Sequence, residues 1–469
     1  MIYPEGLSAY MSNLADLHNH GWMIAWLKIL QRRPFLKLAQ LRDVVYCTLV
    51  LIRSAKLCMV DILLSRRYQR ISMEIMKGFY LAFLFFGVSS LHVFAAHVFP
   101  DTQHSDEVVK SVTFRSPAFT LGPGEVQNTY YQGVPFVKGH VALKGFDAEV
   151  VDENGSSVPL NEVYLHHWIA LNYIGSNSTD YVPQGSKSFN GSIVGNDGVC
   201  PHYALSQLYG LGSETRKTST YLPGHYGIEV GKYENELWLL NVHAIDTRGT
   251  IDPFGCLECR CDLYNVTVRE DGKPLRDGYQ GGLFCCYDGV RCQLKDGFVG
   301  ENRTYYLKYT VHYKEWDDSI LPLKIYILDS TFDGSTCKVE YDVSPCSSKE
   351  IGTSECIHTQ ESRMEVPIGG EVVYAVAHQH KCAVGAAIYG QDGREICTSI
   401  PTYGNGTEPG NEAGYIVGMG TCYPEPGSSH VLNGESIRMI SNYSRSEFHT
   451  GVMGLGYIAV YPHSEAHGF

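Results

Sequence analysis

The 469-residue sequence has no excess of positive charge, because 37 Lys and Arg stand against 50 Asp and Glu, for a net charge of −13. An acidic chain is repelled by a phosphate backbone, so we expect no nucleic-acid partner. The sequence also lacks long stretches rich in Ala, Glu, Lys and Leu, and it has no low-complexity tract or clear repeat. The missing helix-forming stretches argue against a helical bundle.

In their place are 32 Tyr, 48 Gly and short apolar or alternating runs separated by Gly, Pro, Asn and Asp. These runs extend from Val108 to Pro462 and predict an all-β chain built from antiparallel β-sandwiches. The turn residues of "LDSTFDGST" (328–336) indicate a boundary between two sandwiches. We therefore expect a first domain over residues 106–333 and a second over residues 334–463.

The N-terminal part has the features of a secretory signal, although it begins late. Lys77 supplies the positive charge, Phe79 to Ser89 the apolar core, and Val93 and Ala95 a small-residue cleavage site. We expect residues 73–95 to be the signal peptide and residues 1–72 a non-native or disordered extension. The alternative is a membrane anchor, but the apolar run falls short of the ~20 residues that a span needs. No stable span is expected after cleavage.

Glycosylation acceptors and cysteines agree with a secreted, extracellular or cell-wall protein. All seven N-x-[ST] motifs lie after the signal, at Asn154, Asn177, Asn190, Asn265, Asn302, Asn405 and Asn442. Thirteen of the fifteen cysteines also lie beyond Ala95, and in an oxidising compartment such cysteines form disulfides. Because thirteen is odd, one thiol is either free or paired between chains.

One segment, residues 252–300, is dense in cysteine. It carries "CLECRC" and "CCYDGVRC", with the six cysteines Cys256, Cys259, Cys261, Cys285, Cys286 and Cys292. A zinc knot is one interpretation of this spacing. The secreted context and the acceptor at Asn265 favour an insert stapled by disulfides among these six, although the sequence does not choose among the fifteen connectivities.

Histidines in apolar strands form the candidate site. His378 and His380 of "HQH" lie two residues apart and therefore on one face of a strand, as a chelating pair would. His166 and His167 are adjacent in "VYLHHWIAL", so both can bind one ion only if a bulge or a strand end brings them together. His243 ends the apolar run "LWLLNVHA". Each alone is more typical of a core histidine than of a ligand.

A thioether joins the second pair. Met453 is the second residue of the run "VMGLGYIAVY", with His449 four residues before it. The residues then form two sets: His166, His167 and His243 from the first half, and His378, His380 and Met453 from the second. Imidazole together with thioether suits copper, especially Cu(I), and does not suit calcium or magnesium.

The order H-H, "LNVH", H-x-H and a Met opening the last strong strand resembles the copper type II, ascorbate-dependent monooxygenases, which include peptidylglycine α-hydroxylating monooxygenase and dopamine β-monooxygenase. The resemblance implies two jelly-roll sandwiches that bind two copper ions across a solvent-filled cleft, with ascorbate as reductant. The first set would store electrons. The second, with Met453 and Tyr457 as catalytic residues, would hydroxylate a C–H bond of a small or extracellular substrate.

The whole chain, with its Cys-rich insert, is similar to the plant stress up-regulated nodulin family. The peptide-amidating enzymes place an Arg before the H-x-H and an Asn after the Met, where this chain has Val376 and Leu455. Without the Arg there is no bidentate carboxylate clamp, so a peptide ending in glycine is not the expected substrate. The alternative is a non-catalytic, stress-related binding glycoprotein on the same scaffold.

Overall fold

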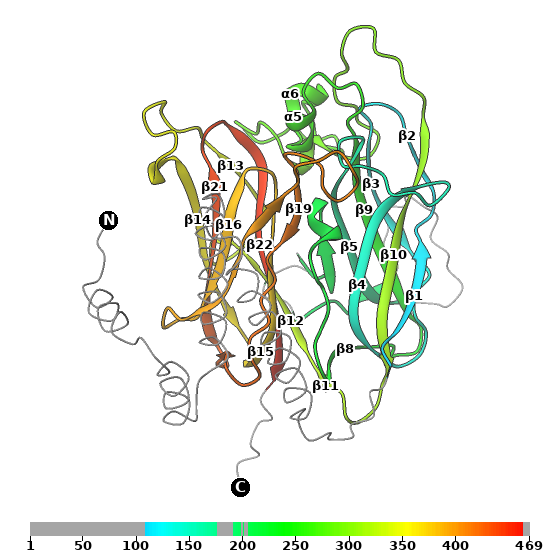
Figure 1. Cartoon of the computed structure of the whole chain (residues 1–469), viewed down its shortest axis with the longest axis vertical. Helices are drawn as coiled ribbons and strands as arrows, with labels where there is room; N and C mark the ends of the chain where they lie inside the picture. Colours follow the sequence, from blue (N-terminus) through cyan, green and yellow to red (C-terminus); the bar gives the residue numbers. More distant parts are fainter. Residues whose placement is uncertain (1–107, 176–190, 198–199, 201–204, 463–469) are drawn as a thin grey trace, which may run out of the picture. The chain divides into compact units, whose positions relative to one another are not determined.

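The computed structural model describes residues 108–175, 191–197, 200 and 205–462 (Figure 1). The predicted extension and signal peptide, together with Asn177 and Asn190, lie outside the described residues. The described chain is built almost wholly from antiparallel strands, which confirms the predicted all-β sandwich fold. Within it, no helix combines the length and the apolar character that crossing a bilayer requires.

Strands from the first half of the chain pair only with one another, in two sheets. The first sheet has the order β1-β10-β4-β8-β11, with β2 on β10: β1 Lys110–Arg115, β10 Arg303–Glu315, β4 Val141–Asp152, β8 Tyr226–Val230, β11 Leu321–Pro322 and β2 Phe119–Leu121. The second has the order β3-β9-β5-β6, with β7 on β5: β3 Val126–Gln132, β9 Glu236–Asp246, β5 Val163–Gly175, β6 Gly191–Ile193 and β7 Tyr209–Leu211.

Strands from the second half form three more sheets. The five-stranded sheet has the order β12-β22-β15-β20, with β13 on β22: β12 Lys324–Asp329, β22 His449–Pro462, β15 Gly370–Gln379, β20 His430–Val431 and β13 Glu340–Val343. The four-stranded sheet has the order β14-β21-β16-β17: β14 Ile357–Val366, β21 Glu435–Ser444, β16 Ala383–Tyr389 and β17 Glu395–Ser399. The last sheet pairs β18 (Pro401–Tyr403) with β19 (Ile416–Met419).

At Leu323, between β11 and β12, the chain leaves the sheets of the first half and enters those of the second. Because β12 pairs with β22, it lies with the second half although it precedes the boundary expected after residue 333. The disulfide Cys200–Cys337 joins the two halves, and two further bridges, Cys346–Cys356 and Cys397–Cys422, lie within the second. Among the described residues only Cys382 is left as a free thiol.

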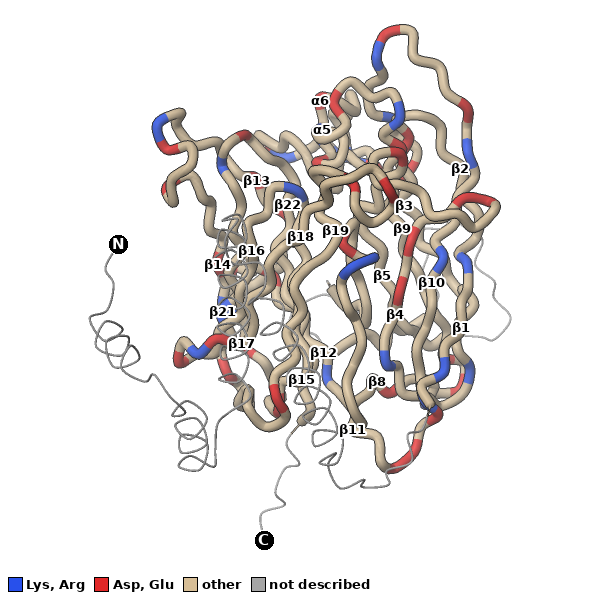
Figure 2. The backbone as a smooth tube through the Cα atoms, viewed as in Figure 1, with Lys and Arg blue, Asp and Glu red and all other residues tan. Residues whose placement is uncertain are grey.

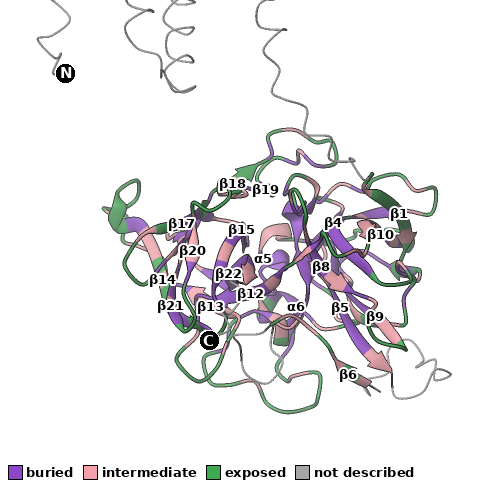
Figure 3. Cartoon of the chain, turned by 90° about the horizontal axis from the view of Figure 1, so that it is seen from below, coloured by how far each residue is buried: buried purple, intermediate pink, exposed green. Residues whose placement is uncertain are grey.

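The burial of side chains along each strand indicates which strands are covered on both faces. In β10 and β21 buried side chains alternate with more exposed ones, as expected of sheets that face the core on one side. In β15 and β22 almost every residue is buried, so both faces are covered (Figure 3). These two strands, like β5 and β9, carry no Lys or Arg, and the basic residues lie on other strands and on loops (Figure 2).

The Cys-rich insert contains two short helices, α5 (Pro253–Leu257) and α6 (Cys261–Tyr264), and the 3₁₀ turn η3 (Leu283–Cys285). Its six cysteines pair among themselves as Cys256–Cys292, Cys259–Cys286 and Cys261–Cys285. Two further 3₁₀ turns are η2 (Ser213–Arg216) and η4 (Ser354–Cys356).

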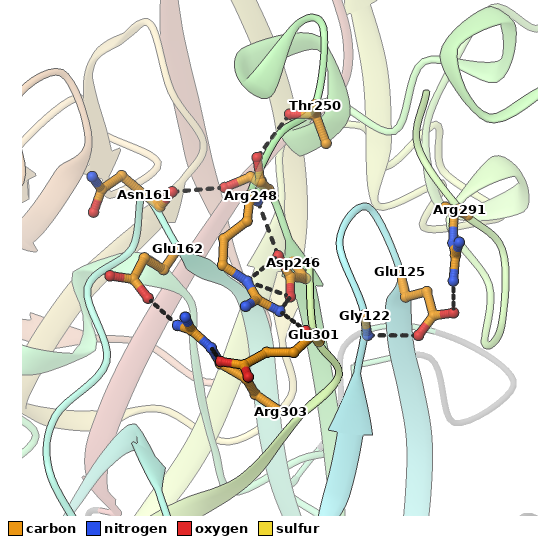
Figure 4. Close-up of polar contacts among 11 residues, drawn as sticks. Gly122, Glu125, Asn161, Glu162, Asp246, Arg248, Thr250, Arg291, Glu301 and Arg303 are labelled. Atoms are coloured by element: carbon orange, nitrogen blue, oxygen red, sulfur yellow. Dashed lines mark hydrogen bonds and ion pairs between the residues drawn. The ribbon is translucent and has the colours of Figure 1, made fainter. Parts of the chain in front are cut away.

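A network of polar contacts fixes the end of β9 (Figure 4). Asp246, fully buried, accepts from Arg248 at 2.5–3.0 Å through both carboxylate oxygens. Arg303 pairs with Glu162 at 3.0 Å and with Glu301 at 3.1 Å beside it. This network therefore joins the end of β9 to the chain before β5 and to the start of β10. The joined end of β9, at Asp246, lies three residues beyond His243.

Candidate metal centre

A β-bulge brings the two adjacent histidines of β5 to the same side. Along the β5–β9 pair the register passes from Leu165 opposite Ala244 to His167 opposite His243, so His166 has no partner. The bulge supplies the condition under which neighbouring residues can share a ligand. One ring nitrogen from each of His166, His167 and His243 lies within 4.8 Å of the others.

The spacing inside this set fits a transition metal. The Nδ1 atoms of His166 and His167 are 3.3 Å apart. Metal–nitrogen bonds of ~2.0–2.1 Å in a tetrahedral site place two ligand nitrogens about 3.3–3.4 Å apart. The Nε2 atom of His167 lies 2.9 Å from Oδ1 of Asn241, which orients the ring and directs Nδ1 toward His166.

The second pair of histidines lies directly against the first set. The rings of His166 and His380 are 4.6 Å apart between centroids, and those of His378 and His380 are 5.2 Å apart. His166, His243, His378 and His380 are each at most 5% exposed. The expected solvent-filled cleft between two separate sites is therefore wrong, because the rings from the two halves pack together as one buried histidine cluster.

Met453 lies on the face of β22 that carries the cluster. Leu455 is the partner of His378 and Tyr457 the partner of Val376, so alternation puts Met453, two residues before Leu455, on this same face. Met453 is buried. Tyr457 accepts a hydrogen bond from Gln207 at 3.1 Å and lines a small cavity of about 30 Å³ between the halves.

A buried carboxylate that the sequence did not reveal orients His378. Glu214 in η2 is fully buried, and its Oε1 lies 2.5 Å from Nδ1 of His378. Its second oxygen accepts from the backbone N–H of Gly212 at 3.0 Å. A carboxylate that accepts a hydrogen bond from one ring nitrogen of a histidine leaves the other nitrogen free as a ligand, as is common around bound metals.

Several ring nitrogens in this cluster have no hydrogen-bond partner of normal geometry. These are both nitrogens of His243 and Nε2 of His378 and of His380, although the backbone of Cys286 lies near the ring of His243 and that of Gly451 near the ring of His380. Buried polar atoms are nearly always paired, so nitrogens without such a partner fit a set of metal ligands.

Burial and the neighbouring imidazoles keep four rings of the cluster neutral, namely those of His166, His167, His243 and His380. Burial first, and then adjacent histidines, hold the pKa values of His166, His243 and His380 well below the ordinary value. Burial, with His378 nearby, lowers the pKa of His167 to about 4, although the bond to Asn241 opposes the shift. Neutral imidazole is the form that binds a metal ion.

The insert covers the cluster from one end. A ring nitrogen of His243 and the sulfurs of Cys259 and Cys286, which form a disulfide, lie within 4.8 Å of one another. Glu258, in the same segment, contacts His449 and Thr450 at the start of β22 at 2.6 and 2.8 Å. The insert therefore contacts both β9, from the first half of the chain, and β22, from the second.

Residues 107–463 match the family model described as Stress up-regulated Nod 19. The chain belongs to this family. No curated protein matches the chain. The similarity to copper monooxygenases stays a prediction.

Solved structures offer only distant similarity. The infectious bursal disease virus VP2 subviral particle is 12% identical, with 78% of this chain and 75% of that chain covered, at a TM-score of 0.18. The mosquito-larvicidal Cry4Aa toxin of Bacillus thuringiensis is 10% identical, with coverage of 68% and 58%, at a TM-score of 0.16. At such scores these structures carry no argument about function.

Proposed function

We propose that this protein is a secreted, stress-related glycoprotein that binds copper in the buried histidine cluster. The observation that carries the proposal is the group of unpaired ring nitrogens on His243, His378 and His380. Imidazole suits copper and zinc alike, and a thioether on the same face favours copper. His166, His167 and His243 would hold one ion, and His378, His380 and Met453 would form the adjoining site for a second.

Secretion and glycosylation are supported by the disulfides and by the exposure of the acceptors. Six disulfides in one chain are typical of an oxidising compartment. Four of the described acceptors are exposed, as attachment of a glycan requires, namely Asn154, Asn265, Asn302 and Asn405. Asn442 is half-buried, and its side chain accepts from Thr359 at 2.8 Å.

Copper analysis of the secreted protein tests the proposal. We expect His243→Ala to lose most of the copper bound per chain, because a ring nitrogen of His243 lies within 4.8 Å of ring nitrogens of His166 and His167, and alanine offers no ligand in its place. His312→Ala is the matched control, since His312 lies on β10 and pairs with Asp147 at 2.7 Å, away from the cluster. Equal copper content in wild type and His243→Ala would contradict the proposal.

Ascorbate-dependent hydroxylation is the second candidate function, and the place of Met453 on the cluster face supports it. Bound copper would supply one-electron redox chemistry with ascorbate as the reductant. The chain's own part is to hold the rings neutral and to keep water from them. Because four of the five rings are almost wholly covered, the arrangement favours metal retention over turnover.

Met453→Ile separates the two candidates. Ile has nearly the volume of Met, so the substitution should cost under about 1.5 kcal/mol of stability. It removes the thioether, so we expect retention of Cu(I) and ascorbate-dependent oxygen uptake to fall at least tenfold, while copper at the first set stays. An oxygen electrode and copper counts in both redox states measure this. Unchanged uptake would exclude the catalytic role of Met453.

A further inference from the structure

A second group of potential ligands lies at the turn after β15, outside the histidine cluster. Cys382 is the free thiol of the described chain and adopts a left-handed backbone conformation, with φ 68°. Its sulfur, a carboxylate oxygen of Glu447 and a ring nitrogen of His449 lie within 4.8 Å of one another. Cys382 comes from the turn after β15 and the other two residues from the chain at the start of β22, and the fold brings the two segments together.

His449 is held as metal-ligating histidines are. Its side chain is 1% exposed, and its Nδ1 lies 2.6 Å from Oε1 of Glu258. Its Nε2 has no hydrogen-bond partner of normal geometry. In this arrangement one ring nitrogen is bonded to a carboxylate and the other has no partner. The same arrangement orients a histidine toward a metal ion.

The charges around this group favour a cation. The carboxylates of Glu258 and Glu447 and the thiol of Cys382 lie around the ring of His449, so three groups that are or can become anionic surround this position. The ammonium of Lys381 lies 3.5 Å from Glu447, and because the side chain of Glu447 is 59% exposed, solvent weakens this pair.

We propose that Cys382, Glu447 and His449 form a zinc site, with Glu258 as the residue that positions His449. Thiolate, imidazole and carboxylate together are the donors that Zn²⁺ takes in proteins, whereas the carboxylate suits Cu(I) poorly. Three protein ligands leave a fourth position on the exposed side of Glu447. The proposal uses no residue of the histidine cluster and does not depend on copper binding there.

Alkylation of Cys382 in the secreted, chelator-treated protein tests the site directly. We expect saturating Zn²⁺ to slow the reaction of Cys382 with iodoacetamide at least tenfold, as measured on its peptide by mass spectrometry. Glu447→Gln, a change on the surface that leaves the core intact, should remove most of this protection. His312→Gln, the control, should keep it. Cys382→Ser should bind one Zn²⁺ fewer per chain and retain the copper of the histidine cluster.

Two outcomes would overturn the zinc site. Alkylation of Cys382 at the same rate with and without Zn²⁺ would show that His449 and Glu258 form a structural pair only. An unchanged zinc count in Cys382→Ser would place the ion elsewhere, and the histidine cluster would be its place if His243→Ala lowered that count.

Discussion

Asp246→Asn is expected to lower the free energy of unfolding by about 3 kcal/mol, at the low end of the ~3–5 kcal/mol that follows loss of one partner from a buried ion pair. Asp246 is fully buried, and the guanidinium of Arg248 is 12% exposed. Removing the carboxylate charge leaves Arg248 with the backbone oxygen of Glu301 and without the carboxylate of its ion pair. Urea unfolding at neutral pH, with the disulfides intact, measures the loss.

The double variant Asp246→Asn, Arg248→Met is the control for this prediction. It removes both charges, so it should cost less than Asp246→Asn alone, because no uncompensated charge remains. A double variant that is less stable than the single one would contradict this account and assign the effect to packing of the Arg248 stem. Because Asp246 lies three residues after His243, the single variant should also loosen the end of β9.

The strands that the sequence specified best are those with a strong local pattern. The run "ESIRMISNYS" corresponds residue for residue to β21, where buried and half-buried side chains alternate. The run "VYLHHWIALNYI" lies within β5. The partner of a strand is not a local property, and for this reason "LKIYILDS" was expected in the first half although β12 pairs with β22.

The histidines of the candidate site could be predicted from the sequence. Most of the residues that orient them could not. The adjacent pair required a bulge, and the structure has one at His166. Asn241, two residues before His243, was within reach of sequence reasoning because it lies in the same run. Glu214 and Glu258 were not, since they contact His378 and His449 across 164 and 191 residues of chain and no local pattern marks them.

The relation between the two histidine sets was also beyond the sequence. The positions of the histidines in the sequence were enough to assign each set to one half of the chain. The contact between the rings of His166 and His380 depends on how closely the halves pack, and several buried side chains set that distance. Among them are Gln207 bonded to Tyr457, and Tyr374, which donates to the backbone oxygen of Ser219 at 2.9 Å.

Glu214→Gln is expected to weaken metal binding by the histidine cluster about 10- to 100-fold, the usual effect of losing a group that orients a ligand. The carboxylate accepts from two donors, the ring of His378 and the backbone N–H of Gly212. Gln keeps the size of the side chain but offers one oxygen and one N–H₂ group, so one of the two donors would face another donor. His378 would then lose its fixed orientation or Gly212 its partner.

Glu412→Gln is the matched control for this variant. Glu412 is 1% exposed, accepts from the backbone N–H groups of Leu160 and Gly410, and pairs with Arg216 at 3.4 Å. It also bridges the two halves, and these contacts do not include a cluster histidine. Both variants should lower stability, since each leaves a buried donor unsatisfied. Competition with a chelator of known affinity, scored per folded chain, should show weaker copper binding for Glu214→Gln alone. If both variants lost affinity equally, the effect would come from packing between the halves, and Glu214 would have no part in orienting His378.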